Sequence, residues 1–135
     1  PPQEIYLRPK TRRVAEFIGT SNRFLGKVVK CDGGVGSVAC DVGMLETMVA
    51  PGVEAGAEVE VAVRPEHVVC QVERPAGSNV LRGVVEKSIF LGSNVHVRLR
   101  LGEKQVQAIL KSEELMSQGQ EVWVQFPSRH CMALR

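Results

Sequence analysis

The chain has 135 residues, a formal net charge of +2 from 17 Lys and Arg against 15 Asp and Glu, and 44% apolar residues. This composition fits one globular domain or two very small ones, and no apolar run approaches the roughly 18 to 20 residues that cross a bilayer. Aromatic residues make up only 4%, beside 13 Gly and 7 Pro, so the core must consist mainly of Val, Leu, Ile and Ala. That balance favours β structure.

The first 21 residues differ from the rest, because their pattern predicts two short helices. Pro2 suits a helix start and Pro9 ends the segment, which leaves one or two turns. In a second helix over 11–18, an apolar stripe must dock on another surface, since so short a helix is not stable alone. The stripe consists of Val14, Phe17 and Ile18. Because the chain opens with two prolines instead of Met, we expect it to be part of a larger protein.

From Asn22 onward the apolar period changes to two, which predicts antiparallel strands. Valines alternate with other residues over 59–63, and apolar residues alternate with His96, Arg98 and Arg100 over 95–101. Ser112 could cap a single helical turn. Shorter strands are predicted at 26–30, 35–41, 68–72, 80–85, 105–110 and 122–126.

The chain also contains an internal repeat. The pattern Ser-Asn-x-x-x-Gly over 21–26 recurs over 78–83, and the strand pattern of 56–61 recurs over 119–124, with His67 and His130 at matching distances afterwards. Two related β units, about 22–76 and 77–135, should close into one shared barrel or two small ones.

The four cysteines have no metal-ligand spacing, so we expect neither a metal site nor a cofactor. A hairpin turn at 32–34 would place Cys31 opposite Val35 and Cys40 opposite Gly26, which argues against a disulfide between Cys31 and Cys40. The expected state of all four is a free, buried or half-buried thiol.

No catalytic motif is present. The chain lacks a G-x-x-x-x-G-K-[ST] phosphate loop and a G-x-S-x-G nucleophile turn, so we expect no enzyme in this chain. Its basic residues are diffuse and its aromatics, Phe24, Phe90, Trp123 and Phe126 among them, are predicted to fill the core. Nucleic-acid binding is therefore not expected, although a barrel that binds single strands remains an alternative.

The densest polar cluster is Arg64-Pro65-Glu66-His67, directly after a strand. Proline there halts strand pairing and presents Arg64, Glu66 and His67 at the rim of a barrel, where the arginine fork could hold an anion or a partner carboxylate. In the alternative interpretation, Arg64 and Glu66 only make local hydrogen bonds. The residue types alone favour neither of these two interpretations.

Four segments of the chain carry a family resemblance: 2–9 (PQEIYLRP), 14–22 (VAEFIGTSN), 63–67 (VRPEH) and 91–93 (LGS) with the strand that follows. In this order they resemble the C-terminal part of the ATPase subunits of ATP-binding-cassette (ABC) importers, especially the spermidine/putrescine type. The resemblance covers essentially the whole chain.

The resemblance implies a fold and a division of the chain. Residues 1–21 would be a helical junction at the end of a nucleotide-binding domain, with Ile5, Tyr6, Val14, Phe17 and Ile18 as docking residues. Residues 22–135 would be a transport-associated OB (TOBE) domain. The expected fold is therefore all-β, with OB-like small barrels built from two related units after short N-terminal helices.

The resemblance also implies a function. The chain would be a regulatory and dimerisation domain, with ATP and Mg held by a preceding domain and the full-length protein a transport ATPase. Its partners would be a second copy, permease subunits and a solute or regulatory protein, at the cytoplasmic face of the inner membrane. Alternatives are the same domain of an iron(III), glycerol-3-phosphate or sugar importer, or a stand-alone module that binds a small ligand or single-stranded nucleic acid.

Overall fold

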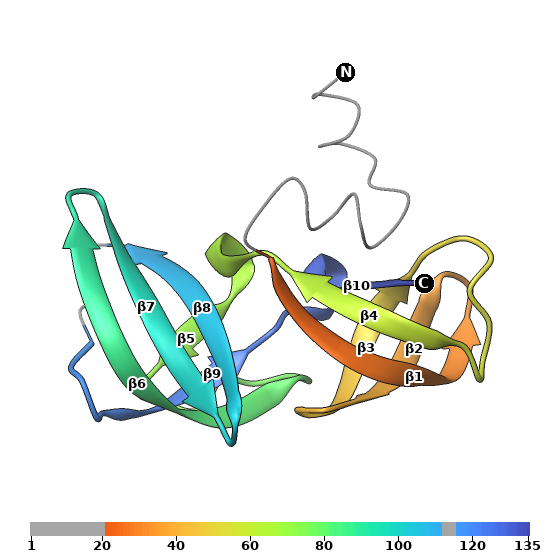
Figure 1. The fold of residues 1–135 in the computed structure, drawn as a ribbon, viewed down its shortest axis with the longest axis horizontal. Coiled ribbons are helices and arrows are strands. Elements are labelled where there is room, and N and C mark those ends of the chain that lie inside the picture. Colours follow the sequence, from red (N-terminus) through yellow and green to blue (C-terminus); the bar gives the residue numbers. More distant parts are fainter. Residues whose placement is uncertain (1–20, 112–115) are drawn as a thin grey trace. The chain divides into compact units, whose positions relative to one another are not determined.

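The computed structural model describes residues 21–111 and 116–135. The predicted N-terminal helices, their docking residues and the helical turn after Ser112 lie outside these ranges. Figure 1 shows the described elements in chain order: β1 (Asn22–Asp32), β2 (Val35–Cys40), β3 (Gly43–Val49), β4 (Glu58–Val63), the 3-10 turn η1 (Pro65–His67), β5 (Val69–Gln71), β6 (Val80–Leu91), β7 (Asn94–Leu101), β8 (Lys104–Lys111), β9 (Glu121–Gln125), the 3-10 turn η2 (Ser128–His130) and β10 (Met132–Leu134).

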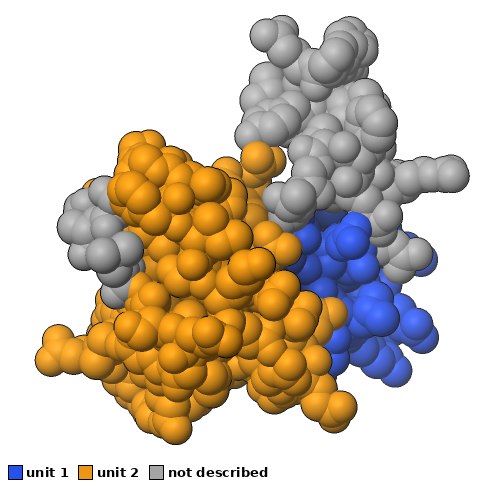
Figure 2. All heavy atoms as spheres, turned by 60° about the vertical axis from the view of Figure 1, so that its left-hand side comes forward, with its two compact units in different colours: residues 1–63, 128–135 blue, residues 64–127 orange. Residues whose placement is uncertain are grey.

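The described chain forms two compact units, coloured separately in Figure 2. The first contains the described residues up to Val63 and residues 128–135, and its strands close into a barrel in the order β1-β2-β3-β10-β4. The second contains residues 64–127, with a five-stranded sheet in the order β5-β9-β6-β7-β8. The predicted all-β, OB-like fold is confirmed.

Alternation of residues along each strand explains which face is buried. Val59, Val61 and Val63 of β4 point into the first barrel, and Val95, Val97, Leu99 and Leu101 of β7 point into the core of the second unit, as their spacing predicts. Two strands were not predicted. In β3 a threonine, Thr47, is buried while Met44 is exposed, and β10 is only three residues long, so neither segment shows a clear apolar period.

All four cysteines lie in the described ranges and none forms a disulfide; Cys70 and Cys131 are buried. Burial raises the pKa of Cys131 to about 12, and the neighbouring charge of Cys40 adds to the shift. Cys40 pairs with Gly26 as predicted, but Cys31 lies opposite Gly36 and not Val35. The difference arises because the turn holds only Gly33 and Gly34, both at positive φ, and because a β-bulge shifts the register between Val28 and Lys30.

The second unit has the same bulge at the equivalent place. In β6 the register shifts between Val85 and Lys87, so Glu86 occupies the position that Val29 has in the first repeat. The hydrogen bonds around the two bulges also match: Val28 N–H donates to Ala57 O at 2.9 Å, and Val85 N–H donates to Gln120 O at 2.9 Å. The repeat read from the sequence is therefore a repeat of structure.

The compact units are divided differently from the two sequence repeats, because the last strand of each repeat belongs to the other unit. β10, at the end of the second repeat, pairs with β3 and β4 of the first unit, where its dark blue ribbon lies among orange and yellow strands in Figure 1. β5, at the end of the first repeat, pairs with β9 of the second unit. These two end strands pair in equivalent registers. Ala133 of β10 lies opposite Val61 of β4, and Cys70 of β5 lies opposite Val124 of β9, the residue equivalent to Val61 in the second repeat.

The prediction that the aromatic side chains fill the core is correct only in part. Phe24 and Phe126 are fully buried, whereas Phe90 is 60% exposed near the tip of the β6–β7 hairpin and Trp123 is half-buried. Trp123 lies on the outer face of β9, between the buried Val122 and Val124, whereas Phe90 pairs with the buried Val95 on the core face and is exposed because it lies near the end of the hairpin. No helix in the described ranges has the length and apolar character that would let it span a membrane.

The exchange of strands predicts that removing Ser128–Arg135 from the end of the second repeat destabilises the first unit. The deletion takes away the buried side chains of Cys131, Ala133 and Leu134 and opens the barrel between β3 and β4. In amide hydrogen exchange, protection in β1–β4 should fall much further than protection in β6–β8. Deletion of Arg135 alone is the control, and unchanged protection in β4 would contradict the exchange.

Candidate functional site

The 3-10 turn η1 holds the predicted cluster in a defined geometry. Pro65 is buried at the start of the turn, the His67 N–H donates to Arg64 O at 3.0 Å, and the Val68 N–H donates to Pro65 O at 3.2 Å. The turn packs against β8 of the same unit. The backbone that carries Arg64, Glu66 and His67 is therefore anchored on one side.

Within the turn, Arg64 and Glu66 form an ion pair. Arg64 Nε donates to Glu66 Oε2 at 2.8 Å, and the two side chains are 35% and 42% exposed. Partial burial acts to raise the pKa of Glu66, but a backbone N–H of its own residue, Arg64 and the nearby His67 together lower it below its usual value. The local hydrogen bond between Arg64 and Glu66, which the structural interpretation of this turn required, is therefore present. A contact between Arg64 and a partner stays a prediction.

The second turn, η2, lacks this charge pair. Residues 127–130 read Pro-Ser-Arg-His, so a proline replaces Arg64 and Arg129 replaces Glu66, while the histidine is kept. The backbone is similar, since the Cys131 N–H donates to Ser128 O at 3.1 Å. The ion pair is therefore a property of the first turn and is not required by the fold.

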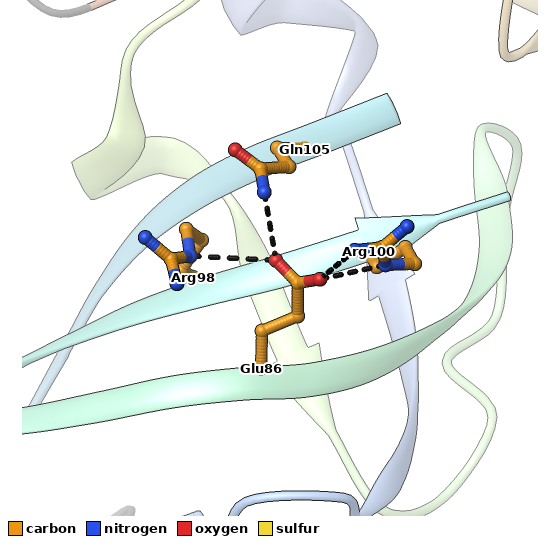
Figure 3. A network of polar contacts seen from close by, with 4 residues as sticks. All are labelled: Glu86, Arg98, Arg100 and Gln105. Carbon is orange, nitrogen blue, oxygen red and sulfur yellow. Dashed lines mark hydrogen bonds and ion pairs between the residues drawn. The ribbon is translucent and has the colours of Figure 1, made fainter. Parts of the chain in front are cut away.

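A polar network that was not predicted surrounds Glu86 on the second unit (Figure 3). One carboxylate oxygen of Glu86, Oε2, accepts a hydrogen bond from Arg100 Nε at 2.6 Å and also pairs with Arg100 Nη2. The other oxygen, Oε1, lies 3.3 Å from Arg98 Nε and accepts a hydrogen bond from Gln105 Nε2 at 3.1 Å. The Glu86 side chain is only 16% exposed. The sequence did place Arg98 and Arg100 on one face, but nothing local to Glu86 reveals the bulge that turns it toward them.

Trp123 lies on the same unit between basic side chains. The guanidinium carbons of Arg82 and Arg74 lie 4.8 Å and 5.0 Å from the centre of its ring, within cation–π distance. Arg82 also forms an ion pair with Glu121. This ring is therefore already in contact with two cations of its own chain. Among the described residues, no group of three or more His, Cys, Asp or Glu could hold a metal ion.

The architecture defines a small all-β domain made of two related five-stranded units with exchanged end strands, and with no catalytic cluster among the sites described above. Residues 61–134 match the TOBE domain family. The chain belongs to this family, as its resemblance to ABC importer subunits predicted.

The full-length relatives are named as polyamine transport proteins. The chain is 32% identical to the spermidine/putrescine import ATP-binding protein PotA of Frankia alni, over 98% of this chain and 32% of that protein. It is 31% identical to PotA of Ruegeria pomeroyi, over 99% of this chain and 37% of the relative. The chain thus spans about a third of the length of these relatives.

A solved structure with the same fold is that of ModG, described as a cytoplasmic molybdate-binding protein. It superimposes with a TM-score of 0.75 over 84% of this chain and 96% of ModG, at 19% sequence identity. At this identity the likeness concerns the fold, and it supports the architecture of two OB-like units.

The lowered pKa of Glu66 predicts a contribution to stability that is present at neutral pH and lost as the pH falls through the titration of the folded protein. Arg64→Ala should raise the pKa of Glu66 toward its ordinary value. The variant should therefore lose less stability at acidic pH than the unchanged chain. Carbon NMR of the Glu66 carboxyl group during a pH titration measures the shift. Arg129→Ala, on the other turn, should leave Glu66 unchanged; an equal effect of both variants would disprove the local ion pair.

Proposed function

We propose that this chain is the regulatory and dimerisation domain of the ATP-binding subunit of an ABC importer for spermidine and putrescine. The observation that carries the proposal is the family match over residues 61–134, together with relatives that are named as spermidine/putrescine import ATP-binding proteins. The same domain in an iron(III), glycerol-3-phosphate or sugar importer would differ in the solute that affects the ATPase.

In this proposal the chemistry of ATP belongs to a nucleotide-binding domain outside this chain. The sequence contains no phosphate loop, so the chain itself contributes no catalytic residue. The whole subunit hydrolyses ATP with Mg, contacts permease subunits and acts at the cytoplasmic face of the inner membrane. The β units then provide a rigid platform for contacts that change the rate of hydrolysis.

The turn around Arg64 is the proposed regulatory contact. Its backbone is anchored on β8 while the charged side chains are about 40% exposed, so a partner can reach them without unfolding the turn. A polyamine is a cation and would not bind an arginine. We therefore assign Arg64 to a carboxylate of a partner protein or subunit, with which Glu66 competes.

Arg64→Ala in the full-length transporter should change how spermidine or a regulatory partner inhibits the ATPase, with a loss of stability of about 1 kcal/mol or less, as is usual for a surface position. Inhibition curves beside thermal melts provide the measurement. Arg129→Ala on η2 is the matched control. A clear loss of stability with unchanged inhibition would instead assign Arg64 a purely structural role.

Dimerisation is supported by apolar side chains on the surface of each unit. At the tip of the β6–β7 hairpin, Ile89, Phe90 and Leu91 are consecutive and all exposed, and in the first unit Leu25 and Val29 of β1 are exposed as well. Such surfaces favour association between copies, and two-fold pairing would bury the same patch on each.

The chain should therefore form a dimer in solution, and Phe90→Ser should weaken it. Light scattering over a range of concentrations measures the effect, with Val72→Ser as a control at another exposed apolar position. The measurement is repeated on a chain without residues 1–19, because the predicted stripe of Val14, Phe17 and Ile18 could associate independently. A monomer in both forms at high concentration would disprove dimerisation through this domain.

A further inference from the structure

The outer face of β6, β7 and β8 in the second unit carries two adjacent rows of side chains. In one row Lys87 of β6 pairs with Arg98 of β7, which pairs with Gln107 of β8. In the next row His96 lies between Ile89 and Ile109. The residues between these positions along β7, Val97 among them, point into the core, so both rows belong to the outer surface.

The first row contains an unfavourable pair of charges. Lys87 and Arg98 lie directly opposite each other on neighbouring strands, where like charges destabilise a sheet. In the described part of the chain, Glu86 is the carboxylate that pairs with Arg98, and it is shared with Arg100. Three cations around one carboxylate leave a local excess of positive charge.

The same side chains line a depression in the surface. Its volume is about 190 Å³, and its lining consists of Lys87, Ile89, His96, Val97, Arg98 and Gln107. The lining offers an ammonium, an imidazole, a guanidinium and an amide as hydrogen-bond donors, and it contains no carboxylate. Within residues 21–111 and 116–135, the side chains of Lys87 and His96 make no hydrogen bond or ion pair with the chain.

We propose that this depression binds a phosphoryl group, as free phosphate or as a phosphate monoester. A phosphate dianion would compensate the excess charge and accept several hydrogen bonds at once. Glu86 holds Arg98 through Nε, which leaves the terminal guanidinium nitrogens for the ligand and fixes their direction. Ile89 supplies an apolar wall for the organic group of an ester. The site is independent of the proposed role in polyamine import, because it selects an anion.

The first test is an NMR titration of the full 135-residue chain with inorganic phosphate and, separately, with phenyl phosphate at constant ionic strength. Saturable shifts of the His96 ring and the Lys87 side chain are expected. Stronger binding of phenyl phosphate identifies a monoester ligand with a contribution from Ile89, and equal binding identifies free phosphate. Sulfate and chloride titrations measure general effects of anions; if chloride produces the same shifts, the proposal is overturned.

The second test uses a matched pair of variants. Lys87→Gln should weaken phosphate binding by about tenfold or more, since it removes one charge-assisted hydrogen bond. It should leave the fold intact, because the Lys87 side chain is exposed and makes no hydrogen bond or ion pair within the described residues. Lys30→Gln changes the equivalent position beyond the bulge of the first unit, where the opposite residue is Ser37 and not an arginine. Equal affinity of the Lys87→Gln variant and the unchanged chain would also overturn the site.

Discussion

The exchange of the last strand between the two repeats is the constraint on which the rest of the structure depends. β10 closes the first barrel and β5 completes the sheet of the second unit, each in the register that its counterpart has in the other unit. Folding of the first unit therefore requires a segment that follows the whole second unit in the sequence, whereas the second unit is contiguous over residues 64–127. The turns η1 and η2 occur where the chain crosses from one unit to the other, so the Arg64–Glu66 pair lies at a point that the exchange fixes.

A shared bulge gives the two units the same framework and lets them differ in chemistry. Each first strand bulges at the same repeat position, where the first unit has Val29 exposed and the second has Glu86 mostly buried against two arginines. In the second unit the hairpin beyond the bulge is also longer, and its tip carries Ile89, Phe90 and Leu91. The proposed regulatory turn and the proposed phosphate site therefore both lie on the second unit.

The candidate sites differ in how far the sequence revealed them. The turn at Arg64 was recognisable because proline after a strand interrupts pairing and groups charged residues, and the structure adds the hydrogen bond to Glu66. The network at Glu86 was half recognisable, since alternation placed Arg98 and Arg100 on one face. The carboxylate that joins them depends on a bulge, which arises from pairing with another strand and has no signal in the segment itself.

By itself the sequence determined the all-β class, the buried faces of β4 and β7 and the existence of a repeat, because side-chain alternation and turn residues act over a few positions. Only the tertiary structure decided which unit each end strand completes. The two end segments pair in equivalent registers and are both only three residues long, so local preference does not distinguish which sheet each completes. The register at Cys31, the exposure of Phe90 and the depression beside Arg98 depend on how neighbouring strands pair and on the bulges between them, which alternation within a single strand does not show.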